Sequence, residues 1–461
     1  SSSAIVVRVN RMPKDKTLTA GRAFENLQSE LLGATQILVG FSGGLDSSVL
    51  LDLLNQTIPS DRITAVHINH GLSPKASEWQ LHAEHFCQER GIACHSESVK
   101  VEFDGQGPEA AARQARYAVF EKLLRQDGVL LLGHHQDDQS ETLLYRLMRS
   151  SGPLGLSGIP VRRSIGAGTL YRPLLTWSKE SLKTYALDRS IQWVEDESNN
   201  CNDYDRNFLR NRLIPILAER WPDYRQRLSG VSAISQDSAE LCRDLAIQDL
   251  ASLQSRPERA GASLLINSFN DLSGVRQKNV LRHWAETQDR CAPSQKIIHE
   301  IIKAVVEARI DASPKVICQD TEYRRYDGRL YVLDSRKLVS RSVEQPLNIL
   351  WHVDEAVNLG GGMQLEAMPA LGEGLRMPQS GTFRIGNRRG GEHCHPVGRS
   401  HSNSLKKCLQ EFGLEPWWRD RVPLIFLDQQ LIAVADLWVC ENWQVQPEEI
   451  GIKIHWHDNS L

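Results

Sequence analysis

Short apolar runs rich in β-branched residues alternate with longer amphipathic stretches over residues 36–149. The runs have the length of buried strands, and the stretches between them have helical spacing. The predicted strands cover residues 36–41, 62–68, 92–99 and 129–133, and the predicted helices cover residues 46–55, 74–90, 109–126 and 136–149. This alternation predicts an α/β domain built on a doubly wound parallel sheet, which binds ligands beyond the carboxyl ends of its strands.

The pattern changes after residue 149. Residues 150–168 are rich in Gly, Ser and Pro, which predicts a surface loop. Residues 206–309 have a mostly helical pattern, and no strong strand precedes residues 316–318. Residues 323–333 read as a hairpin that turns at Asp327-Gly328. A polar segment, 335–345, then separates this region from short β-rich runs broken by Gly and Pro.

These changes predict five segments. Residues 1–34 are an N-terminal extension, and residues 35–225 form the α/β domain with the doubly wound parallel sheet. A mainly helical middle domain covers residues 226–340. Residues 341–380 are a linker with the start of the C-terminal part, and residues 381–461 form a small α+β C-terminal domain.

Composition excludes several classes of protein. The 461 residues are 41% hydrophobic and 24% charged, and the apolar runs are too short to span a bilayer. The N-terminus lacks the pattern of a secretory signal. Nine scattered cysteines include no C-x-x-C pair, which argues against a disulfide framework and favours a cytoplasmic protein. The net charge of −3 means that any nucleic acid must meet a local basic surface.

The sharpest motif is Ser42-Gly43-Gly44-Leu45-Asp46-Ser47, between the first predicted strand and the first predicted helix. Two glycines allow a tight turn and close approach to an anion, and the helix presents free N–H groups to the same place. The motif therefore predicts a phosphate cradle without the lysine of a Walker loop. Asp46 is predicted to bind Mg²⁺, since a bare carboxylate would repel phosphates. The plainer alternative is a strand–turn–helix corner with a serine cap.

This hexapeptide resembles the loop of the PP-loop ATP pyrophosphatases, which split ATP between its α and β phosphates. Further blocks resemble the tRNA(Ile)-lysidine synthase family in order and spacing. They are His67-Ile68-Asn69-His70-Gly71-Leu72, residues 109–117, residues 133–142, Tyr171-Arg172-Pro173-Leu174-Leu175, residues 193–199 and residues 205–212. Near the end, Arg399, Leu405-Lys406-Lys407 and residues 416–424 resemble the C-terminal domain of the three-domain members.

The resemblance implies a ligase that forms a carbon–nitrogen bond. In that family ATP adenylates the C2 oxygen of the wobble cytidine of the isoleucine tRNA with a CAU anticodon. The ε-amine of L-lysine then displaces AMP and leaves lysidine. The implied co-substrate is ATP and the implied cofactor is Mg²⁺. The middle and C-terminal domains are implied to bind the tRNA, and the oligomeric state stays open.

Several polar residues suit this chemistry. Ser42, Gly43, Gly44, Leu45, Asp46 and Ser47 are predicted to bind ATP, and Asp46 and Asp138 are candidate metal ligands. The predicted residues for lysine and cytidine are Asp137, Glu141, Arg113, Arg116 and Arg206. Asp46, Asp137, Arg113 and His134 are predicted to be catalytic. The spacing of His134 and Asp137 also allows a transition-metal site, and surface arginines are the plainer reading of Arg113 and Arg116.

Five polar residues in the blocks at residues 193–199 and 205–212 have more than one possible role. Asp196, Asn199, Arg206, Asn207 and Arg210 are expected to be lid or tRNA contacts rather than core residues, because polar side chains are rarely buried unpaired. Which residue is the base for the lysine amine is left open.

A basic segment near the C-terminus suits RNA. Residues 381–407 hold six basic residues and one acid. The residues predicted to bind tRNA are Arg388, Arg389, Arg399, Lys406, Lys407 and Arg419. Trp417 and Trp418 either stack on bases or belong to the core. The run His393-Cys394-His395 suggests zinc, but a solvated loop fits its spacing better.

Two rival functions remain. A tRNA thiolase of the same superfamily would also adenylate a base, yet sulfur delivery usually needs paired cysteines, which this chain lacks. Synthetases that take nitrogen from glutamine need an amidotransferase domain, and none is recognisable here. A catalytically inactive tRNA-binding protein is the alternative of another class, and the intact Ser42–Ser47 loop argues against it.

Overall fold

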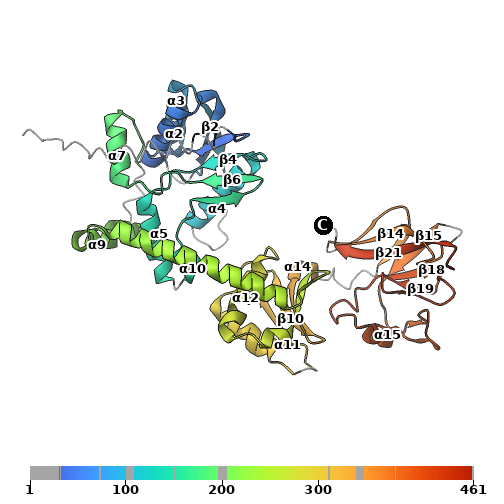
Figure 1. Cartoon of the computed structure of the whole chain (residues 1–461). Helices are drawn as coiled ribbons and strands as arrows, with labels where there is room; N and C mark the ends of the chain where they lie inside the picture. The colour runs from blue at the N-terminus through green and yellow to red at the C-terminus, as the bar shows by residue number, and fades with distance from the viewer. Residues whose placement is uncertain are drawn as a thin grey trace, which may run out of the picture. The chain divides into compact units, whose positions relative to one another are not determined.

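The computed structural model describes residues 28, 31, 33–71, 74–99, 108–149, 151–195, 205–309, 312–338, 347–360, 362–378 and 381–458. Two compact units divide the chain, Ser1–Glu240 and Leu241–Leu461 (Figure 1). Most of the predicted N-terminal extension and the beginning of the predicted linker lie outside the described residues. The division into five segments stays a prediction.

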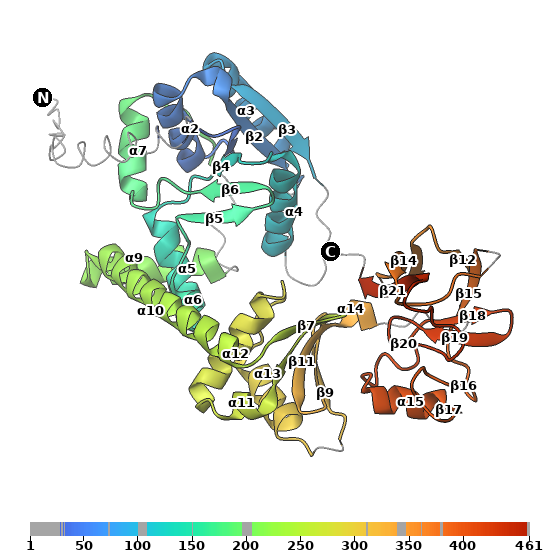
Figure 2. The ribbon, with the colours of Figure 1, turned by 45° about the vertical axis from the view of Figure 1, so that its right-hand side comes forward.

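The first unit is built on a six-stranded sheet (Figures 1 and 2). Its strands are β1 (Ile37–Gly40), β2 (Ile63–Asn69), β3 (Ala93–Ser98), β4 (Val129–Leu131), β5 (Arg162–Ile165) and β6 (Gly168–Tyr171). Their order is β3-β2-β1-β4-β6-β5; all neighbours are parallel except β5, an antiparallel edge strand. The predicted doubly wound parallel sheet is confirmed, and β1 lies at its centre.

Helices cover both faces of this sheet. The helices of this part of the chain are α2 (Leu45–Thr57), α3 (Ala76–Glu89), α4 (Pro108–Leu123), α5 (Gln136–Met148), α6 (Pro153–Leu156), α7 (Lys179–Asp188), α8 (Asp205–Phe208), α9 (Ile214–Arg220) and α10 (Tyr224–Ser252), with the 3₁₀ helix η1 (Ser60–Arg62) and the π-helix η3 (Leu209–Leu213). Alternate residues of β1 serve different cores: Ile37 and Val39 pack with α2 and α3, and Leu38 packs with Phe120 of α4. This two-sided burial explains why the central strands β1 and β4 are apolar throughout.

The predicted surface loop at residues 150–168 contains regular structure. Helix α6 and the hairpin of β5 and β6 lie there. The hairpin turns at Gly166, whose φ of 47° suits glycine. Strand β5 reads Arg-Arg-Ser-Ile and is mostly exposed, so it lacks the apolar alternation that would reveal a strand in the sequence.

The middle part of the second unit combines helices with a sheet. Its strands are β7 (Arg256–Glu258), β8 (Gly261–Leu265), β9 (Lys315–Cys318), β10 (Thr321–Tyr326) and β11 (Arg329–Asp334), in the antiparallel order β7-β8-β11-β10-β9. Its helices are α11 (Ile266–Asn270), α12 (Gly274–Glu286), α13 (Gln295–Glu300), the π-helix η4 (Ile301–Val306) and α14 (Ser335–Leu338). The predicted hairpin at Asp327-Gly328 is present.

The prediction of a mainly helical middle domain is therefore not confirmed. Strand β8, with the sequence Gly-Ala-Ser-Leu-Leu, was missed. Its partner β11 pairs Leu330 with Leu264 from far along the chain. Small residues and a distant partner leave little local signal for a strand.

The C-terminal part is strand-rich with one helix, as expected for a small α+β domain. It contains β12 (Asn348–His352), β13 (Val357–Gly360), β14 (Met363–Leu371), β15 (Thr382–Gly386), β16 (His393–Cys394), β17 (Asn403–Ser404), α15 (Leu405–Phe412), β18 (Leu424–Leu427), β19 (Gln430–Val434), β20 (Trp438–Val439) and β21 (Ile450–Asp458). Trp418 is 2% exposed, and Trp417 packs edge-on against Tyr331 of β11. Both tryptophans therefore belong to the core rather than to a stacking surface.

None of the helices in the described part of the chain is long and apolar enough to cross a membrane.

Candidate active site

The loop Ser42–Ser47 lies at the carboxyl end of β1, as predicted. Its two serines hold it closed: the hydroxyl groups of Ser42 and Ser47 are 3.0 Å apart, and Ser47 Oγ donates to the carbonyl of Gly44. Gly43 has a φ of 80° and accepts a hydrogen bond from the amide of Val194 at 2.9 Å. A glycine suits this left-handed position, and the bend leaves the loop amides at the sheet edge.

Helix α2 begins directly after this loop, and its N-cap is Gly44, which has no side chain to cap the helix. Free N–H groups and the positive end of the helix dipole therefore face the loop. A Cβ on Gly133, at the end of β4, would come within 3.0 Å of the backbone of Asp46. The close approach that this glycine permits brings the ends of β1 and β4 together at one site.

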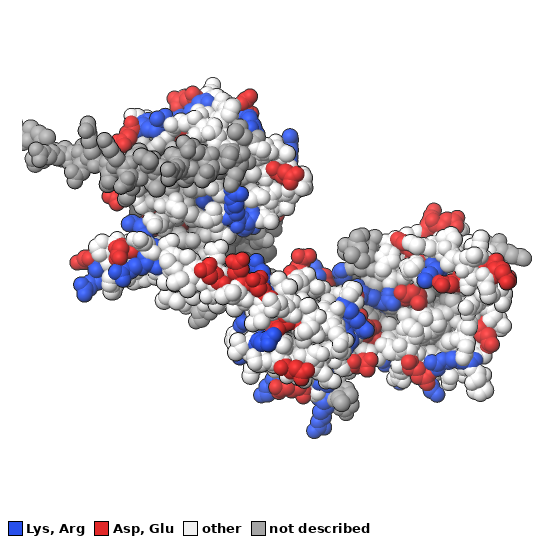
Figure 3. Space-filling view, in the orientation of Figure 1, with Lys and Arg blue, Asp and Glu red and all other residues white. Residues whose placement is uncertain are grey.

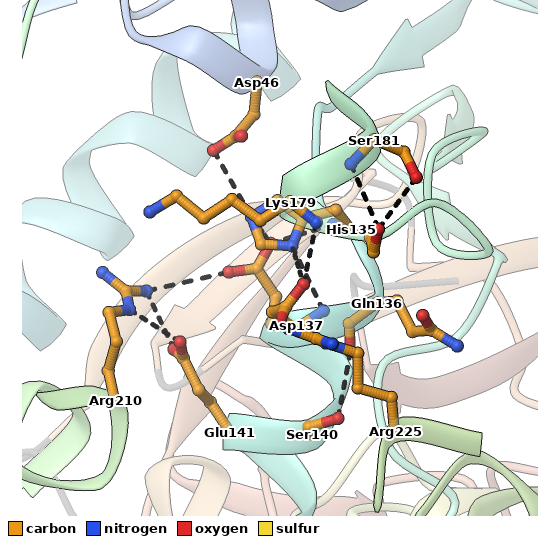
Figure 4. Close-up of polar contacts among 12 residues, drawn as sticks. Asp46, His135, Gln136, Asp137, Ser140, Glu141, Lys179, Ser181, Arg210 and Arg225 are labelled. Atoms are coloured by element: carbon orange, nitrogen blue, oxygen red, sulfur yellow. Dashed lines mark hydrogen bonds and ion pairs between the residues drawn. The ribbon is translucent and has the colours of Figure 1, made fainter. Parts of the chain in front are cut away.

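A buried imidazole links the two strand ends (Figure 4). His135 Nε2 lies 3.5 Å from Asp46 Oδ2 and 3.6 Å from Asp138 Oδ2. Its Nδ1 accepts the amide hydrogen of Asp137 at 3.2 Å, and Asp138 accepts the amide hydrogen of His135 at 2.9 Å. This capping box begins α5. Since Nδ1 is an acceptor, the ring proton lies on Nε2 and points between two carboxylates.

Burial and the carboxylates around His135 act on its pKa in opposite directions. Burial is the largest effect and lowers the pKa of His135, but the hydrogen bond to Asp46 and the charges of Asp138, Asp46 and Asp137 outweigh it. The pKa of His135 is therefore raised above its ordinary value. Asp46 is also special because its Oδ1 is buried without a hydrogen-bond partner among the described residues.

Asp137 is fully engaged by the chain itself. Its Oδ2 accepts the amide hydrogen of Lys179 at 2.8 Å, and its Oδ1 accepts from Arg225 Nε at 2.5 Å and from the Tyr224 hydroxyl at 3.3 Å (Figure 4). Burial, the largest effect, raises the pKa of Asp137, but the Lys179 amide and Arg225 outweigh it and lower the pKa. This carboxylate joins the starts of α5, α7 and α10.

Glu141 lies one turn further along α5 and forms a two-pronged ion pair with Arg210. The distances from its oxygens to Arg210 Nε and Nη2 are 2.6 and 2.8 Å. Arg210 also lies 3.9 Å from Asp138 Oδ1, and it comes from the π-helix η3. Burial raises the pKa of Glu141 more than Arg210 lowers it. Such π-turns often mark functional sites, and this one brings a guanidinium to the acidic turn.

His134 faces a group of arginines. Its Nδ1 accepts from Arg172 Nε at 3.3 Å. Burial, then the charges of Arg172, Arg113 and Arg116, lower the pKa of His134 to about 3. The ring is therefore neutral near pH 7 and carries its proton on Nε2. Arg113 and Arg116 are both exposed on α4.

Two metal sites that the sequence allows only as less favoured alternatives do not form among the described residues, which contain no group of three or more His, Cys, Asp or Glu side chains arranged to hold a metal ion. His395 Nε2 donates to the Arg399 carbonyl and its Nδ1 pairs with Glu441, whereas His393 and Cys394 form the short strand β16, which pairs with β17. The sites proposed for zinc and for a transition metal at His134 are thus not supported. The site residues Asp196 and Asn199 lie outside the described residues.

The predicted tRNA-binding residues of the C-terminal part differ in their surroundings. Arg388 pairs with Asp420 at 3.1 Å, and Arg399 pairs with Glu411. Arg419 donates to the Leu414 carbonyl and to the Tyr326 hydroxyl, so it fastens the fold of this unit. Lys406 and Arg389 are exposed, and Lys407 lies 3.8 Å from Glu411. On the face in Figure 3, basic and acidic side chains are interspersed over this part.

Comparisons with known proteins agree with this site. A family model of the PP-loop domain matches residues 16–217, and models of the TilS substrate binding domain and the TilS substrate C-terminal domain match residues 264–331 and 383–456. The tRNA(Ile)-lysidine synthase of Coxiella burnetii is 36% identical over 91% of this chain and 93% of its own length. That of Legionella pneumophila (strain Paris) is 38% identical over 88% of this chain and 93% of its own. The chain belongs to the tRNA(Ile)-lysidine synthase family.

Among solved structures, the chain is similar to the U34-tRNA thiolase NcsA of Methanococcus maripaludis, with a TM-score of 0.38 and 17% identity over 46% of this chain and 79% of that one. The three family models match separate parts of the chain, and the PP-loop model covers the site described above except Tyr224 and Arg225.

Sequence reasoning missed three residues of this tRNA(Ile)-lysidine synthase family site. His135 lies in the block of residues 133–142 but was assigned no role, yet it joins Asp46 to Asp138. Arg225 and Arg172 were not singled out, although each contacts a predicted site residue. Arg172 stands in the Tyr-Arg-Pro block that marked the family, which was the one available signal. Nothing near Arg225 in the sequence distinguishes it from neighbouring arginines of α10.

Proposed function

We propose that this protein is a tRNA(Ile)-lysidine synthetase. It ligates L-lysine to C2 of the wobble cytidine of CAU-anticodon tRNA(Ile) through an adenylated cytidine, and it releases AMP and PPi. Membership of the family over nearly the whole chain supports this reaction. The observation that carries the proposal is the Ser42–Ser47 loop at the carboxyl end of β1, directly beside the acidic start of α5.

In the first step the cytosine C2 oxygen attacks the α-phosphorus of ATP. The loop formed by Ser42, Gly43, Gly44, Leu45 and Ser47 holds the departing diphosphate with its amides, its hydroxyls and the start of α2. Donors fixed in place before the reaction stabilise the charge that builds on the leaving group. The loop has no lysine, so its cations must come from elsewhere.

Asp46 and Asp138 fit a Mg²⁺ ion. Oxygens of both carboxylates lie within 3.6 Å of the same nitrogen of His135, and the other oxygen of Asp46 is buried without a partner among the described residues. In ATP sites Mg²⁺ is usually held by one or two carboxylates together with the phosphates, so a complete cage of protein ligands is not needed. The ion supplies positive charge to the diphosphate when bound.

In the second step the lysine ε-amine must lose a proton before it attacks C2, because free lysine is a cation near neutral pH. Glu141 is buried, and Arg210 donates to both of its oxygens. Asp138 is 22% exposed, and it is placed to hold the ammonium group and to accept its proton. Asp137, whose oxygens are taken by Lys179 and Arg225, acts as a positioning residue for this turn.

The remaining predicted residues keep narrower roles. His134 is neutral and offers its Nε2 proton to a substrate oxygen. Arg113, Arg116 and Arg206 bind anionic parts of the substrates. Exposed cations of the basic segment, Arg389 and Lys406, contact tRNA phosphates.

The test uses the full chain with CAU-anticodon tRNA(Ile), ATP, Mg²⁺ and L-lysine. We expect PPi release that requires the tRNA, and a mass increase of the tRNA that corresponds to lysine minus water. Leaving out lysine should stop the mass increase. PPi release with the tRNA but no incorporation of lysine would indicate another base modification. If no PPi is released under any condition, the alternative of a catalytically inactive tRNA-binding protein would hold.

A further inference from the structure

An aromatic ring of the first unit is surrounded by three guanidinium groups. The Cζ atoms of Arg113 and Arg163 each lie 4.9 Å from the ring centroid of Tyr117. Arg113 Nη2 donates to the Tyr117 hydroxyl at 3.2 Å, and Arg172 Nη2 reaches the same oxygen at 3.5 Å. We call these four residues the Tyr117 cluster. They come from α4, from the edge strand β5 and from the end of β6.

The positive charge of the Tyr117 cluster is not neutralised by the described residues. Within that part of the chain, Arg113, Arg163 and Arg172 form no ion pair with a carboxylate. Burial, the largest effect, raises the pKa of Tyr117, but Arg113, Arg172 and Arg163 outweigh it and lower the pKa. Three like charges around one ring repel each other, so an anion bound among them would be strongly favoured.

The cluster is tied to the active site but lies apart from the phosphate loop. Arg172 Nε donates to Nδ1 of His134, next to the imidazole that joins Asp46 and Asp138. In the sheet order β1-β4-β6-β5, however, the loop follows β1, whereas Arg163 lies on β5 and Arg172 directly follows β6. A ligand in the cluster therefore lies beside a diphosphate in the loop and does not replace it.

Further arginine–tyrosine pairs occur on the same unit. Arg162 of β5 lies over the ring of Tyr171 at 4.4 Å, and Arg149 lies over Tyr145 at 5.3 Å. Arginines interleaved with aromatic rings are typical of surfaces that bind single-stranded RNA, because they offer both phosphate contacts and stacking planes. A lone carboxylate, such as that of free lysine, needs only one bidentate arginine.

We infer that the Tyr117 cluster binds a backbone phosphate of the RNA substrate next to the reacting pyrimidine. This inference rests on the proposed function and extends it. Arg163 supplies one charged contact from the exposed hairpin, and Tyr117 holds the guanidinium groups of Arg113 and Arg163 in place by cation–π contact. The phosphate so held positions the cytidine beside His134 and the loop.

The test compares Arg163→Ala, Arg163→Lys and a control, Arg125→Ala. Arg163 and Arg125 are both exposed arginines of the first unit, but the control lies beyond the other end of α4, after Leu123. Affinity for a CAU-anticodon stem-loop RNA is measured by fluorescence anisotropy at several salt concentrations. We expect Arg163→Ala to weaken binding about tenfold and to reduce the salt slope by about one, with no change for Arg125→Ala. Arg163→Lys should keep most of the wild-type salt slope, because the positive charge remains.

RNA with a neutral methylphosphonate on either side of the wobble cytidine identifies the phosphate. The methylphosphonate at the contacted position and Arg163→Ala each reduce the binding free energy for RNA. Their two losses should not add, because both changes remove the same interaction. Additive losses at both positions would overturn the inference. So would a rise in the KM for lysine or ATP with unchanged RNA affinity, which would place a carboxylate or ATP in the cluster.

Binding of the stem-loop needs no chemistry, so this result is independent of the reaction. If wild-type protein bound the stem-loop with the expected dependence on Arg163 but made no lysidine, the proposed function would fail and the RNA site would stand. If it made lysidine while Arg163→Ala bound RNA as tightly as wild type, the inference would fail alone.

Discussion

Three neighbouring acids of α5 show that a residue's partners decide its role. Asp137 is held by two chain donors at opposite oxygens, and Glu141 is paired with Arg210. Asp138 is 22% exposed and shares His135 with Asp46. The same carboxylate chemistry thus serves positioning and charge pairing within two turns, and metal binding under the function proposed above. Among the carboxylates in the described part of the chain, only Asp46 keeps a buried oxygen without a partner.

Asp46→Asn tests the metal role of this carboxylate. The change keeps the shape of the side chain but removes its charge, so we expect tRNA-dependent PPi release to fall by about 100-fold or more. The side chain is 35% exposed, so the fold should survive. Asp61→Asn, at an exposed position of η1, is the matched control and should behave as wild type. Equal PPi release by both variants would rule out the metal role.

His134 makes stability depend on pH in a defined direction. Its pKa is about 3 in the folded protein, against an ordinary value of 6.5. The unfolded chain therefore binds a proton that the folded chain excludes, so the stability due to His134 is full above pH 6.5 and is lost as pH falls toward 3. We expect His134→Gln, which can still accept from Arg172, to lose less stability than wild type between about pH 7.5 and about pH 5 in urea unfolding. Identical losses would show that the ring is not kept neutral.

At the scale of elements, the site depends on how helix starts are fastened to one another. The starts of α7 and α10 are both bound to Asp137 at the start of α5. Helix η3 adds Arg210 to the next turn of α5. These contacts hold the acidic turn against the ends of β1 and β4, where the loop lies.

Arg225→Ala should loosen this junction. The change leaves Asp137 buried with fewer donors, and removing one partner of a buried pair is costly. We expect the free energy of unfolding to fall by about 2 kcal/mol. This is less than the loss for a fully buried ion pair, because the Arg225 side chain is 31% exposed. Arg227→Ala on the same helix removes an exposed pair with Asp223 and should change little. Chemical denaturation of the two variants checks this, and equal losses would contradict the positioning role of Asp137.

At the scale of the whole molecule, a chain with a net charge of −3 binds a polyanion only through local basic surfaces. In the second unit some basic side chains are used to hold the fold, as Arg419 does through Tyr326. Others, such as Lys406, are exposed. The first kind contributes stability, and only the second kind is available to phosphates.

Arg419→Ala and Lys406→Ala should therefore affect different properties, the first thermal stability and the second tRNA binding. We expect Lys406→Ala to lower the salt slope of full-length tRNA binding by about one and to leave the melting temperature unchanged. Arg419→Ala should lower the melting temperature and leave the slope unchanged. Binding titrations over a range of salt and thermal melts give both quantities. A reversal of the two patterns would place Arg419 at the RNA and Lys406 in the fold.

The sequence by itself determined the parallel sheet, the phosphate loop and the family, because each depends on local pattern. Strand and helix periods are visible within ten residues, and the loop needs Gly43 and Gly44 at adjacent positions. The hairpin between β10 and β11 was also predicted correctly, because its turn residues Asp327-Gly328 are a local signal.

Only the tertiary structure decided what the polar residues do. Asp137 meets Lys179 and Arg225 across 42 and 88 residues, and Glu141 meets Arg210 across 69. Strand β8 pairs with β11, and Trp418 packs edge-on against Trp456 in the core, through contacts that are also distant in sequence. Hydrogen bonds and burial depend on which groups are neighbours in the folded chain, and a single sequence does not show contacts between residues that are distant along it.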